Sequence, residues 1–381
     1  MSNKVIIVTS TRADYGLLKE VINEAENSGN RFELLVTGTH LEKEYGYTIQ
    51  EILSDNTLVH HQIPLELVED ELLPNIIARC IVKFTAVLQE LRPDMLLLLG
   101  DRYEILALAI TAYTLNIPIA HIHGGEVTKG ALDEGFRHSI SKMASLHFPV
   151  TQFYKERLIR MGEHPNTVFN FGAPVVDVIN KLKLERLDEL SKQLGLSLYP
   201  KEFIICTLHP ETSSVVLVEK QIESVLNALK KLPEYKVIFT MPNSDPGNMI
   251  IRNKVREFLN LEHRRCVIVE SLGFKRYISL LKNAFCMLGN SSSGMTEAPM
   301  MGIPTINIGN RQTGRLQLDS ILSCSFDDEE IIQKISQVEN KNIKKDFPFG
   351  KGGASKRIIE KLSEIEMIKM ANKEFYDYQT T

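Results

Sequence analysis

Tryptophan is absent from this chain of 381 residues, and cysteine is scarce. The five cysteines show no C-x-x-C spacing, and Cys206, Cys266 and Cys286 lie in apolar runs. This pattern predicts buried thiols rather than zinc ligands or disulfides. The formal net charge is only −4, so no bulk basicity favours nucleic acid or an anionic membrane as a partner.

Long hydrophobic runs are also missing. None approaches the roughly 18 residues that a helix needs to span a bilayer. The first residues enter a strand pattern at once, which leaves no room for a signal peptide. With 43% hydrophobic and 24% charged residues, the composition is typical of a globular protein with a large core. We therefore expect a cytoplasmic protein of two or three domains.

Short apolar runs alternate with segments of helical periodicity along the chain. The runs that we read as strands are residues 5–9, 32–37, 94–99, 117–122, 146–150, 168–170, 203–207, 237–240, 267–270, 285–288 and 303–307. Most are apolar throughout, which is typical of parallel strands covered on both faces. The pattern predicts an α/β fold with two doubly wound, Rossmann-like sheets.

We place the first domain at residues 1–172 and the second at residues 173–354. A charged helix is expected over residues 175–196, and the second sheet begins at residue 203 after a turn at residues 199–201. A final helix is expected over residues 358–375.

A turn of small residues follows the strand at residues 285–288. Gly289 and Asn290 can turn sharply, and the serines after them offer N-cap hydroxyls to a helix that begins near Gly294. Such a helix start presents backbone N–H groups and a positive dipole end, which suits a phosphate. The serines could equally serve only as a helix cap.

A glycine-bearing basic loop at residues 308–315 carries Arg311 and Arg315. Guanidinium groups grip phosphate oxygens bidentately, so this loop suits a diphosphate. Glu297, in the first turn after the serines, could accept a pair of ribose hydroxyls or could only cap its helix.

Charged side chains also follow strands in the first half. Arg12 comes after the first strand, and Asp101 and Arg102 follow the strand at residues 94–99, at the edge where open α/β sheets bind ligands. No G-x-G-x-x-G follows the first strand, so a dinucleotide site is not supported. Ion pairs or a helix cap would also explain these residues.

His121 and His123 alternate on the strand at residues 117–122 and its exit, and Glu126 follows them. The two histidines could hold a metal, but no third ligand stands at metal spacing, so we expect no metal.

The next helix is expected to open with Asp133 as its N-cap and to run to about residue 145. Arg137 and His138 lie one turn later, beside Asp133 or Glu134. Together with Glu126, these carboxylates suit acid–base chemistry, or they serve only for capping and surface pairing.

His209 stands at the end of the strand at residues 203–207, and Pro210 halts that strand. A lone histidine is usually a satisfied core residue, but this one precedes a helix in a loop. We therefore favour a functional role in proton transfer.

Taken together, these motifs resemble those of the hydrolysing UDP-N-acetylglucosamine 2-epimerases, enzymes of sialic-acid biosynthesis. The resemblance covers nearly the whole chain and is carried by residues 11–16, 99–104, 123–126, 137–138, 209–210, 289–292 and 311–315. It implies a glycosyltransferase-B architecture with the active site in an interdomain cleft. It further implies a C-terminal helix at about residues 355–381 that packs on the first domain, and a homodimer or homotetramer.

The resemblance also implies roles for individual residues. The UDP moiety would be held by Arg12, Arg102, Ser291, Ser292, Glu297 and Arg311, with Asn243 and the main chain near Leu272 around the uridine. Asp101, Asp133 and His209 would match catalytic positions, with Arg137 in support. Many relatives carry Glu where this chain has His123, so either His123 or Glu126 would be the acid or base at C2.

By the same resemblance, the chain would convert UDP-N-acetylglucosamine and water to N-acetylmannosamine and UDP. Elimination to 2-acetamidoglucal and hydration with inversion at C2 would need neither a metal nor another cofactor. Three alternatives remain at this point. They are a hydrolysing 2-epimerase of a UDP- or GDP-linked 2,4-diacetamido-trideoxyhexose (legionaminic-acid pathway), a glycosyltransferase of the same fold, and a catalytically silent nucleotide-sugar sensor.

Overall fold

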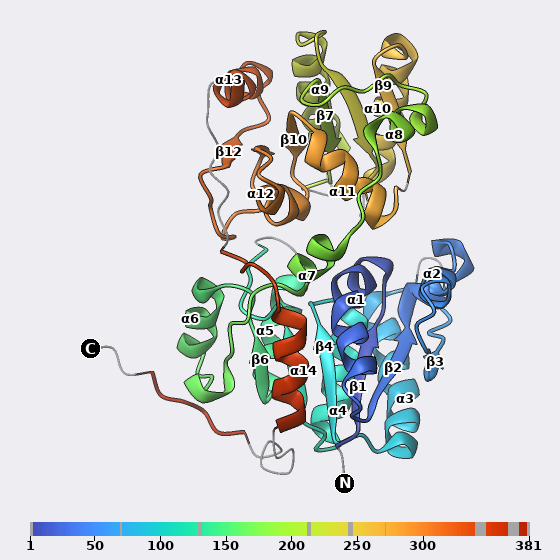
Figure 1. Ribbon diagram of the computed structural model, residues 1–381, viewed down its shortest axis with the longest axis vertical. Coiled ribbons are helices and arrows are strands. Elements are labelled where there is room, and N and C mark those ends of the chain that lie inside the picture. The colour runs from blue at the N-terminus through green and yellow to red at the C-terminus, as the bar shows by residue number, and fades with distance from the viewer. Residues whose placement is uncertain are drawn as a thin grey trace. The chain divides into compact units, whose positions relative to one another are not determined.

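The computed structural model describes residues 3–68, 71–128, 132–211, 215–242, 247–270, 272–339, 348–364 and 373–378. The chain forms two compact units (Figure 1). Unit 1 comprises Met1–Glu126, Ala131–Lys181 and Pro348–Thr381, and unit 2 comprises Val127–Gly130 and Leu182–Phe347. Each unit contains a six-stranded sheet in which all the strand pairs are parallel. The predicted α/β fold with two Rossmann-like sheets is confirmed.

The sheet of unit 1 has the strand order β3-β2-β1-β4-β5-β6. Its strands are β1 (Val5–Thr9), β2 (Phe32–Thr37), β3 (His61–Ile63), β4 (Met95–Leu99), β5 (Ile119–Ile122) and β6 (Leu146–Phe148). Its helices are α1 (Arg12–Asn27), α2 (Ile49–Ser54), α3 (Leu73–Leu91), α4 (Tyr103–Thr114), α5 (Leu132–Met143), α6 (Gln152–Arg160), α7 (Pro174–Lys181) and α14 (Ala354–Glu364).

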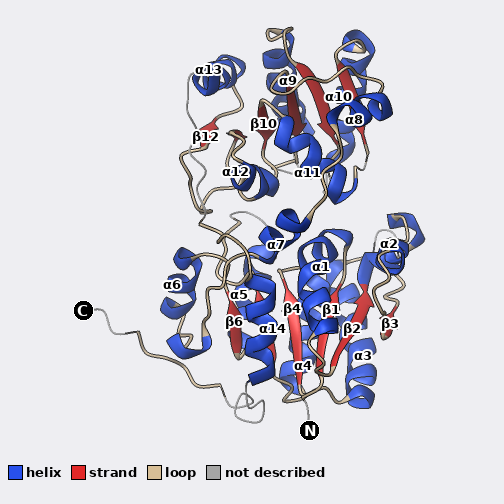
Figure 2. Cartoon of the chain, viewed as in Figure 1, coloured by secondary structure: helices blue, strands red, loops and turns tan. Residues whose placement is uncertain are grey.

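Both faces of this sheet are covered, because successive residues of a strand point to opposite sides. Val5 and Ile7 of β1 pack in one core cluster with residues of α1 and α14. Ile6 and Val8 pack in another with residues of α3, α4 and α5. Helices therefore flank the strands on both sides (Figure 2), which explains why the strands read as continuous apolar runs.

β1 and β4 are neighbours in the sheet, although β2 and β3 lie between them in sequence. Strands β2 and β3 extend the sheet on one side of β1, and β4, β5 and β6 extend it on the other side. Open α/β sheets bind ligands beyond the carboxyl ends of strands at such a reversal. Arg12 and Asp101 follow these two strands.

Unit 2 has the strand order β12-β11-β10-β7-β8-β9. Its strands are β7 (Phe203–Thr207), β8 (Lys236–Thr240), β9 (Cys266–Val269), β10 (Cys286–Gly289), β11 (Thr305–Ile308) and β12 (Ile321–Cys324). Its helices are α8 (Leu187–Leu194), α9 (Val215–Lys230), α10 (Asn248–Glu262), α11 (Gly273–Asn283), α12 (Glu297–Met301) and α13 (Asp328–Glu339). Here the reversal lies between β7 and β10, the strands that precede His209 and the serine turn.

Several predicted elements differ from the structure. The helix expected over residues 175–196 is wrong, because α7 ends at Lys181 and α8 starts at Leu187. Between them the backbone N–H of Glu185 donates to Ser279 Oγ at 2.9 Å instead of to a helical carbonyl. Residues 168–170 are not a strand; Val168 makes only an isolated bridge to His147.

The final helix also differs. α14 begins at Ala354, earlier than predicted, because the Asp177 carboxylate accepts hydrogen bonds from the backbone N–H groups of Gly353 and Ser355 at the helix start. Residues 373–378 are not helical. There the backbone N–H of Tyr376 donates to Gly162 O at 3.0 Å.

All five cysteines are buried and free, which confirms the prediction that they are core thiols. Among the described residues, no helix is both long enough and apolar enough to cross a membrane.

Candidate functional site

The first cluster lies in unit 1, where the loop after β4 meets α5. The carboxylate of Asp101 pairs with the guanidinium of Arg137, which also reaches Glu134 Oε2 at 3.2 Å. Arg137 is buried, whereas the Asp101 side chain keeps 24% of its surface exposed. The nearby carboxylates, Asp101 first, raise the pKa of Arg137 against the opposing effect of burial. The pair is therefore a fixed charged unit with one carboxylate accessible to a ligand.

His123 and Glu126 form a second pair at the exit of β5. His123 Nδ1 lies 2.6 Å from Glu126 Oε1. A carboxylate can only accept, so Nδ1 carries a proton, and in the neutral form of the ring Nε2 then holds the lone pair. Nε2 is buried without a hydrogen-bond partner among the residues that the structure describes. His123 also has a φ of +67°, a conformation that costs a residue other than glycine about 1–3 kcal/mol. This pair has the chemistry of an oriented general base.

Arg12 and Arg102, both expected near a diphosphate, make ion pairs within unit 1. Arg12 is the first residue of α1. Thr11 explains this start, because its side chain accepts the N–H of Asp14 at 3.2 Å. Arg12 Nε lies 2.9 Å from Glu51 Oε2.

Arg102 Nε lies 2.5 Å from Oε1 of Glu104, a carboxylate with no exposed surface. Asp14 belongs to the same charged group. Desolvation raises the pKa of Asp14 to about 6, against the opposing charge of Arg102. Sequence reasoning missed Asp14 and Glu104, because an acidic residue near a helix start looks like an ordinary cap.

Asp133 is placed differently from its prediction. α5 begins at Leu132, so Asp133 lies within the first helical turn and not at the N-cap. Its side chain is exposed. On this helix it is Glu134 that reaches Arg137, and Glu134 also lies 3.1 Å from His138 Nε2. The structure therefore brings Asp101, Glu134 and Arg137 together.

In unit 2, the serine turn follows β10. Gly289 has a φ of +129°, and a Cβ there would lie 1.9 Å from Thr207 O, so only glycine fits. The prediction that a helix begins near Gly294 is wrong. A single 3-10 turn spans Ser292–Gly294, and α12 begins only at Glu297. Pro299 explains the delay, because proline is tolerated in a first helical turn but would disrupt a helix interior.

The three serines of this turn differ in their hydrogen bonds and in their exposure. Ser291 is the N-cap of the 3-10 turn, and its side chain accepts the N–H of Ser293 at 3.4 Å. Ser293 Oγ accepts a hydrogen bond from Tyr277 at 2.7 Å. Ser292 is exposed. Ser292 is thus the serine of the turn that faces solvent.

Asn290 holds His209 by its backbone. Asn290 Oδ1 accepts the N–H of His209 at 2.7 Å, and Nδ2 donates to the carbonyl of His209 at 2.8 Å. Asn290 is fully buried and His209 nearly so. The turn after β10 and the loop after β7 are therefore locked together at the reversal of the second sheet.

Glu211 and Gln312 hold the loop that carries Arg311. Glu211 accepts the backbone N–H groups of Asn310 at 3.2 Å and Arg311 at 2.8 Å. Gln312 Nε2 donates to Asn290 O at 2.8 Å, and Arg311 Nη1 lies 3.3 Å from the same oxygen. The structure thus brings His209, the serine turn and Arg311 together within unit 2. Sequence reasoning missed Asn290, Glu211 and Gln312 as positioning groups.

The remaining predicted binding residues take varied positions. Leu272 is the N-cap residue of α11, without a side-chain cap bond. Glu297 opens α12, and its carboxylate accepts a hydrogen bond from the Thr296 hydroxyl. Asn243 lies outside the described residues. No group of three or more His, Cys, Asp or Glu side chains in the described part of the chain could hold a metal ion.

Comparison with known proteins agrees with this arrangement of motifs. The profile of a family described as UDP-N-acetylglucosamine 2-epimerase matches residues 23–363. The chain belongs to this family. Membership confirms the predicted resemblance and makes the chain a member of an enzyme family.

Two relatives illustrate the range within the family. The chain is 36% identical over 371 residues to the UDP-N,N'-diacetylbacillosamine 2-epimerase (hydrolyzing) of Legionella pneumophila, covering 96% of this chain and 97% of that protein. It is 31% identical over 364 residues to the UDP-N-acetylglucosamine 2-epimerase of Neisseria meningitidis serogroup B, covering 95% and 94%.

A solved structure supports the fold. The crystal structure of UDP-GlcNAc 2-epimerase from Neisseria meningitidis bound to UDP-GlcNAc superposes with a TM-score of 0.82 at 21% sequence identity, covering 94% of this chain and 99% of that one. The 2-epimerase family shares the glycosyltransferase-B architecture that the sequence predicts.

Proposed function

We propose that this chain is a hydrolysing 2-epimerase that converts UDP-N-acetylglucosamine and water to N-acetylmannosamine and UDP. The observation that carries the proposal is the His123–Glu126 pair, since it presents a basic nitrogen at the edge of a sheet that also bears the Asp101–Arg137 pair. Epimerisation at C2 needs one group that takes a proton and another that returns one. Family membership supplies the reaction class.

In the first step, we propose that His123 Nε2 removes the proton from C2 of the sugar. The electron pair forms a C1–C2 double bond as the C1–O bond breaks, and UDP leaves. Glu126 stabilises the imidazolium that results, because its carboxylate accepts the Nδ1–H. The product of this step is 2-acetamidoglucal.

In the second step, water adds its hydroxyl at C1 and a proton is delivered to C2 on the opposite face. We assign this second proton to Asp101, whose partly exposed carboxylate first takes up a proton from solvent and then delivers it. The proton that the added water loses and the proton held by His123 pass back to solvent. Two acid–base groups in different surroundings can hold different pKa values, as a two-proton reaction at neutral pH requires.

Residues of unit 2 serve the departing diphosphate in this proposal. Negative charge grows on the leaving oxygen, and hydrogen-bond donors fixed beforehand stabilise such charge. Arg311, Ser292 and His209 are the donors that we assign, with Arg12 and Arg102 of unit 1. The hydrogen bonds of Asn290 and Glu211 keep His209 and Arg311 in place without the substrate.

A second candidate substrate has support from sequence identity. The Legionella pneumophila relative, at 36% identity, carries the name of a UDP-N,N'-diacetylbacillosamine 2-epimerase, whereas the Neisseria meningitidis enzyme named for UDP-N-acetylglucosamine stands at 31%. The same elimination and hydration would apply to that sugar, because its C1 and C2 groups are alike.

Incubation with each nucleotide sugar tests both candidates. We expect release of UDP and of N-acetylmannosamine from UDP-N-acetylglucosamine, identified by NMR of the free sugar. A kcat/KM at least tenfold higher for UDP- or GDP-linked N,N'-diacetylbacillosamine would transfer the proposal to that substrate. Absence of free sugar from all of them would refute a hydrolysing epimerase.

A further inference from the structure

His121 is a fully buried histidine of β5 that the steps above do not use. Its Nε2 lies 2.8 Å from the carbonyl oxygen of Gly100, and its Nδ1 lies 3.1 Å from Ser141 Oγ. A carbonyl can only accept, so Nε2 carries the proton. Nδ1 of the neutral ring then accepts the hydroxyl hydrogen of Ser141. Burial lowers the pKa of His121 to about 3, which agrees with a neutral ring.

The two hydrogen bonds end beside the Asp101–Arg137 pair. Gly100 immediately precedes Asp101 and has a φ of +82°, so the direction of its carbonyl is tied to the path by which the chain leaves β4. Ser141 lies on α5, about one helical turn after Arg137. One imidazole therefore links the backbone that carries the carboxylate to the helix that carries the guanidinium.

The same hydrogen bond supports the loop of His123. A Cβ at Gly124 would lie 2.9 Å from Ser141 Oγ and 3.0 Å from His121 Nδ1. The backbone next to His123 thus packs against the bond between His121 and Ser141. Glycine is required there because the approach is close, not because its backbone is left-handed.

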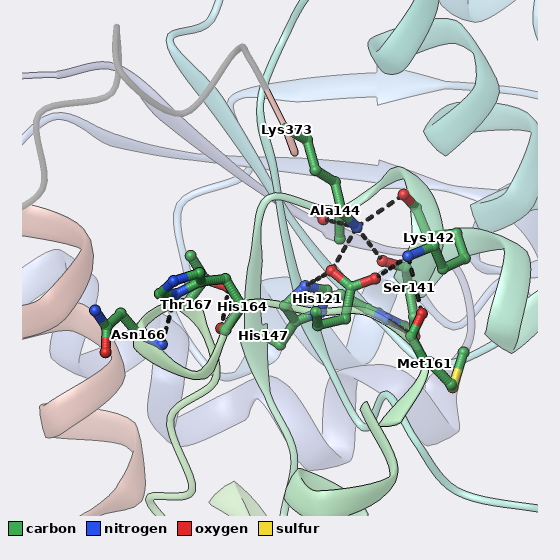
Figure 3. Close-up of polar contacts among 11 residues, drawn as sticks. His121, Ser141, Lys142, Ala144, His147, Met161, His164, Asn166, Thr167 and Lys373 are labelled. Atoms are coloured by element: carbon green, nitrogen blue, oxygen red, sulfur yellow. Dashed lines mark hydrogen bonds and ion pairs between the residues drawn. The ribbon is translucent and has the colours of Figure 1, made fainter. Parts of the chain in front are cut away.

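His147 shows that burial of a histidine in this sheet does not by itself produce such links. It is the register partner of His121 on β6 and is equally buried. Its Nε2 lies 2.8 Å from Glu163 Oε2. Glu163 is joined to Lys142 of α5 and to Lys373 of the segment at residues 373–378 (Figure 3). His147 therefore belongs to the polar network around Glu163, whereas His121 connects to both reactive loops.

We propose that His121 is a positioning residue that sets the placement of Asp101 and His123 relative to α5. It touches no reacting atom. The inference rests on the proposed function, because it assigns importance to Asp101 and His123 through their chemistry. The placement of Asp101 against Arg137 can be measured whether or not the chain has the proposed activity.

Four variants of the full chain test this role. His121→Leu removes both hydrogen bonds, and His121→Gln keeps an amide donor for the carbonyl of Gly100. Ser141→Ala removes only the hydrogen bond between Ser141 and His121 Nδ1. His147→Leu is the matched control on the next strand. We expect His121→Leu to lower kcat for UDP release by about 10- to 100-fold, with KM and the Kd for UDP near those of the wild type. His121→Gln should recover most of this loss, and His147→Leu should keep the wild-type kcat.

Crystal structures of the wild type and of His121→Leu or, where that variant does not fold, of Ser141→Ala complete the test. We expect the Asp101 carboxylate to move away from Arg137 in the variant. An unchanged Asp101–Arg137 pair would overturn the inference, as would a kcat that falls equally in His121→Leu and His147→Leu. If the wild type releases no sugar, the proposed function fails, and the crystal structures alone decide whether His121 places Asp101.

Discussion

Asp101 and Arg137 stand 36 residues apart in sequence, and their ion pair forms because α5 packs against the sheet that contains β4. Arg137 is buried and Asp101 is partly exposed. Loss of the Asp101 charge would leave the guanidinium with Glu134 and would remove the carboxylate assigned to C2.

We therefore expect Asp101→Asn to lower kcat by about a hundredfold or more, the size typical of a lost acid–base group. UDP should still bind, because Asp101 is not assigned to the diphosphate. Isothermal titration with UDP and a turnover assay measure the two effects. Asp188→Asn, at an exposed ion pair with Arg186, is the control and should keep full activity. A loss of UDP affinity in Asp101→Asn would contradict the assignment.

Asn290 supplies a second prediction. Asn290→Ala removes both hydrogen bonds to the His209 backbone and leaves a buried donor and a buried acceptor unmet. We expect a loss of about 1–3 kcal/mol in the free energy of unfolding, and a fall in kcat for UDP release. Denaturation followed by circular dichroism measures the first, since the chain has no tryptophan. A stable variant with wild-type turnover would show that His209 needs no such support.

The sequence indicated the chemistry of individual site residues better than their partners. Asp101, His123 and His209 could be chosen because each follows a buried strand. The pairing of Arg137 with Asp101 depends on how a helix packs against a sheet, which the local pattern does not contain. Asn290 looked like a turn residue, and only the fold brings its amide to the backbone of His209, 81 residues away.

The segment at residues 373–378, which belongs to neither sheet, contributes to the stability of unit 1. Lys373 Nζ donates to the carbonyls of Ser141, Lys142 and Ala144 at 3.1, 2.8 and 2.7 Å, and it lies 2.5 Å from Glu163 (Figure 3). The ammonium thus fills the C-terminal end of α5, where helical carbonyls lack partners of their own.

Lys373→Met should therefore destabilise unit 1. Three carbonyls lose their donor, and a buried group left unsatisfied costs about 1–3 kcal/mol, while the Glu163 carboxylate keeps Lys142 and His147. The exposed pair of Lys356 with Glu360 on α14 gives a matched control. Lys356→Met should cost less than about 1 kcal/mol. Urea denaturation of the two variants compares them, and equal midpoints would contradict the role given to Lys373.

Most strands and long helices could be predicted from period and apolarity, but short elements could not. β3 and β12 have only three and four residues, and neither is apolar throughout. The start of α12 depended on the position of Pro299. The break between α7 and α8 depended on a hydrogen bond from Glu185 to a distant serine, which no local pattern reveals.

At the scale of the whole molecule, two buried histidines of unit 1 predict the acid response. Burial lowers the pKa of His40 to about 4 and that of His121 to about 3. Both folded values lie below the unfolded value of about 6.5. The unfolded chain therefore binds more protons between pH 6.5 and about 4, so stability must fall as the pH falls through this window. Burial lowers the pKa of a third histidine, His147, as well. Asp14, with its pKa raised to about 6, opposes this trend but is one group against three.

We expect a lower urea midpoint for unit 1 at pH 5 than at pH 7. His40→Gln should flatten the dependence by about one proton, or about 1.4 kcal/mol per pH unit. Circular dichroism at both pH values measures the change in the wild type and the variant. A midpoint that rises on acidification would contradict neutral, buried histidines.

At the scale of the whole reaction, the same elimination and hydration serve both candidate nucleotide sugars. In both, a proton leaves and returns at C2. Turnover of UDP-N-acetylglucosamine in D₂O tests it most directly, with NMR of the released sugar. We expect N-acetylmannosamine that carries deuterium at C2. Released sugar that keeps its original hydrogen at C2 would contradict it.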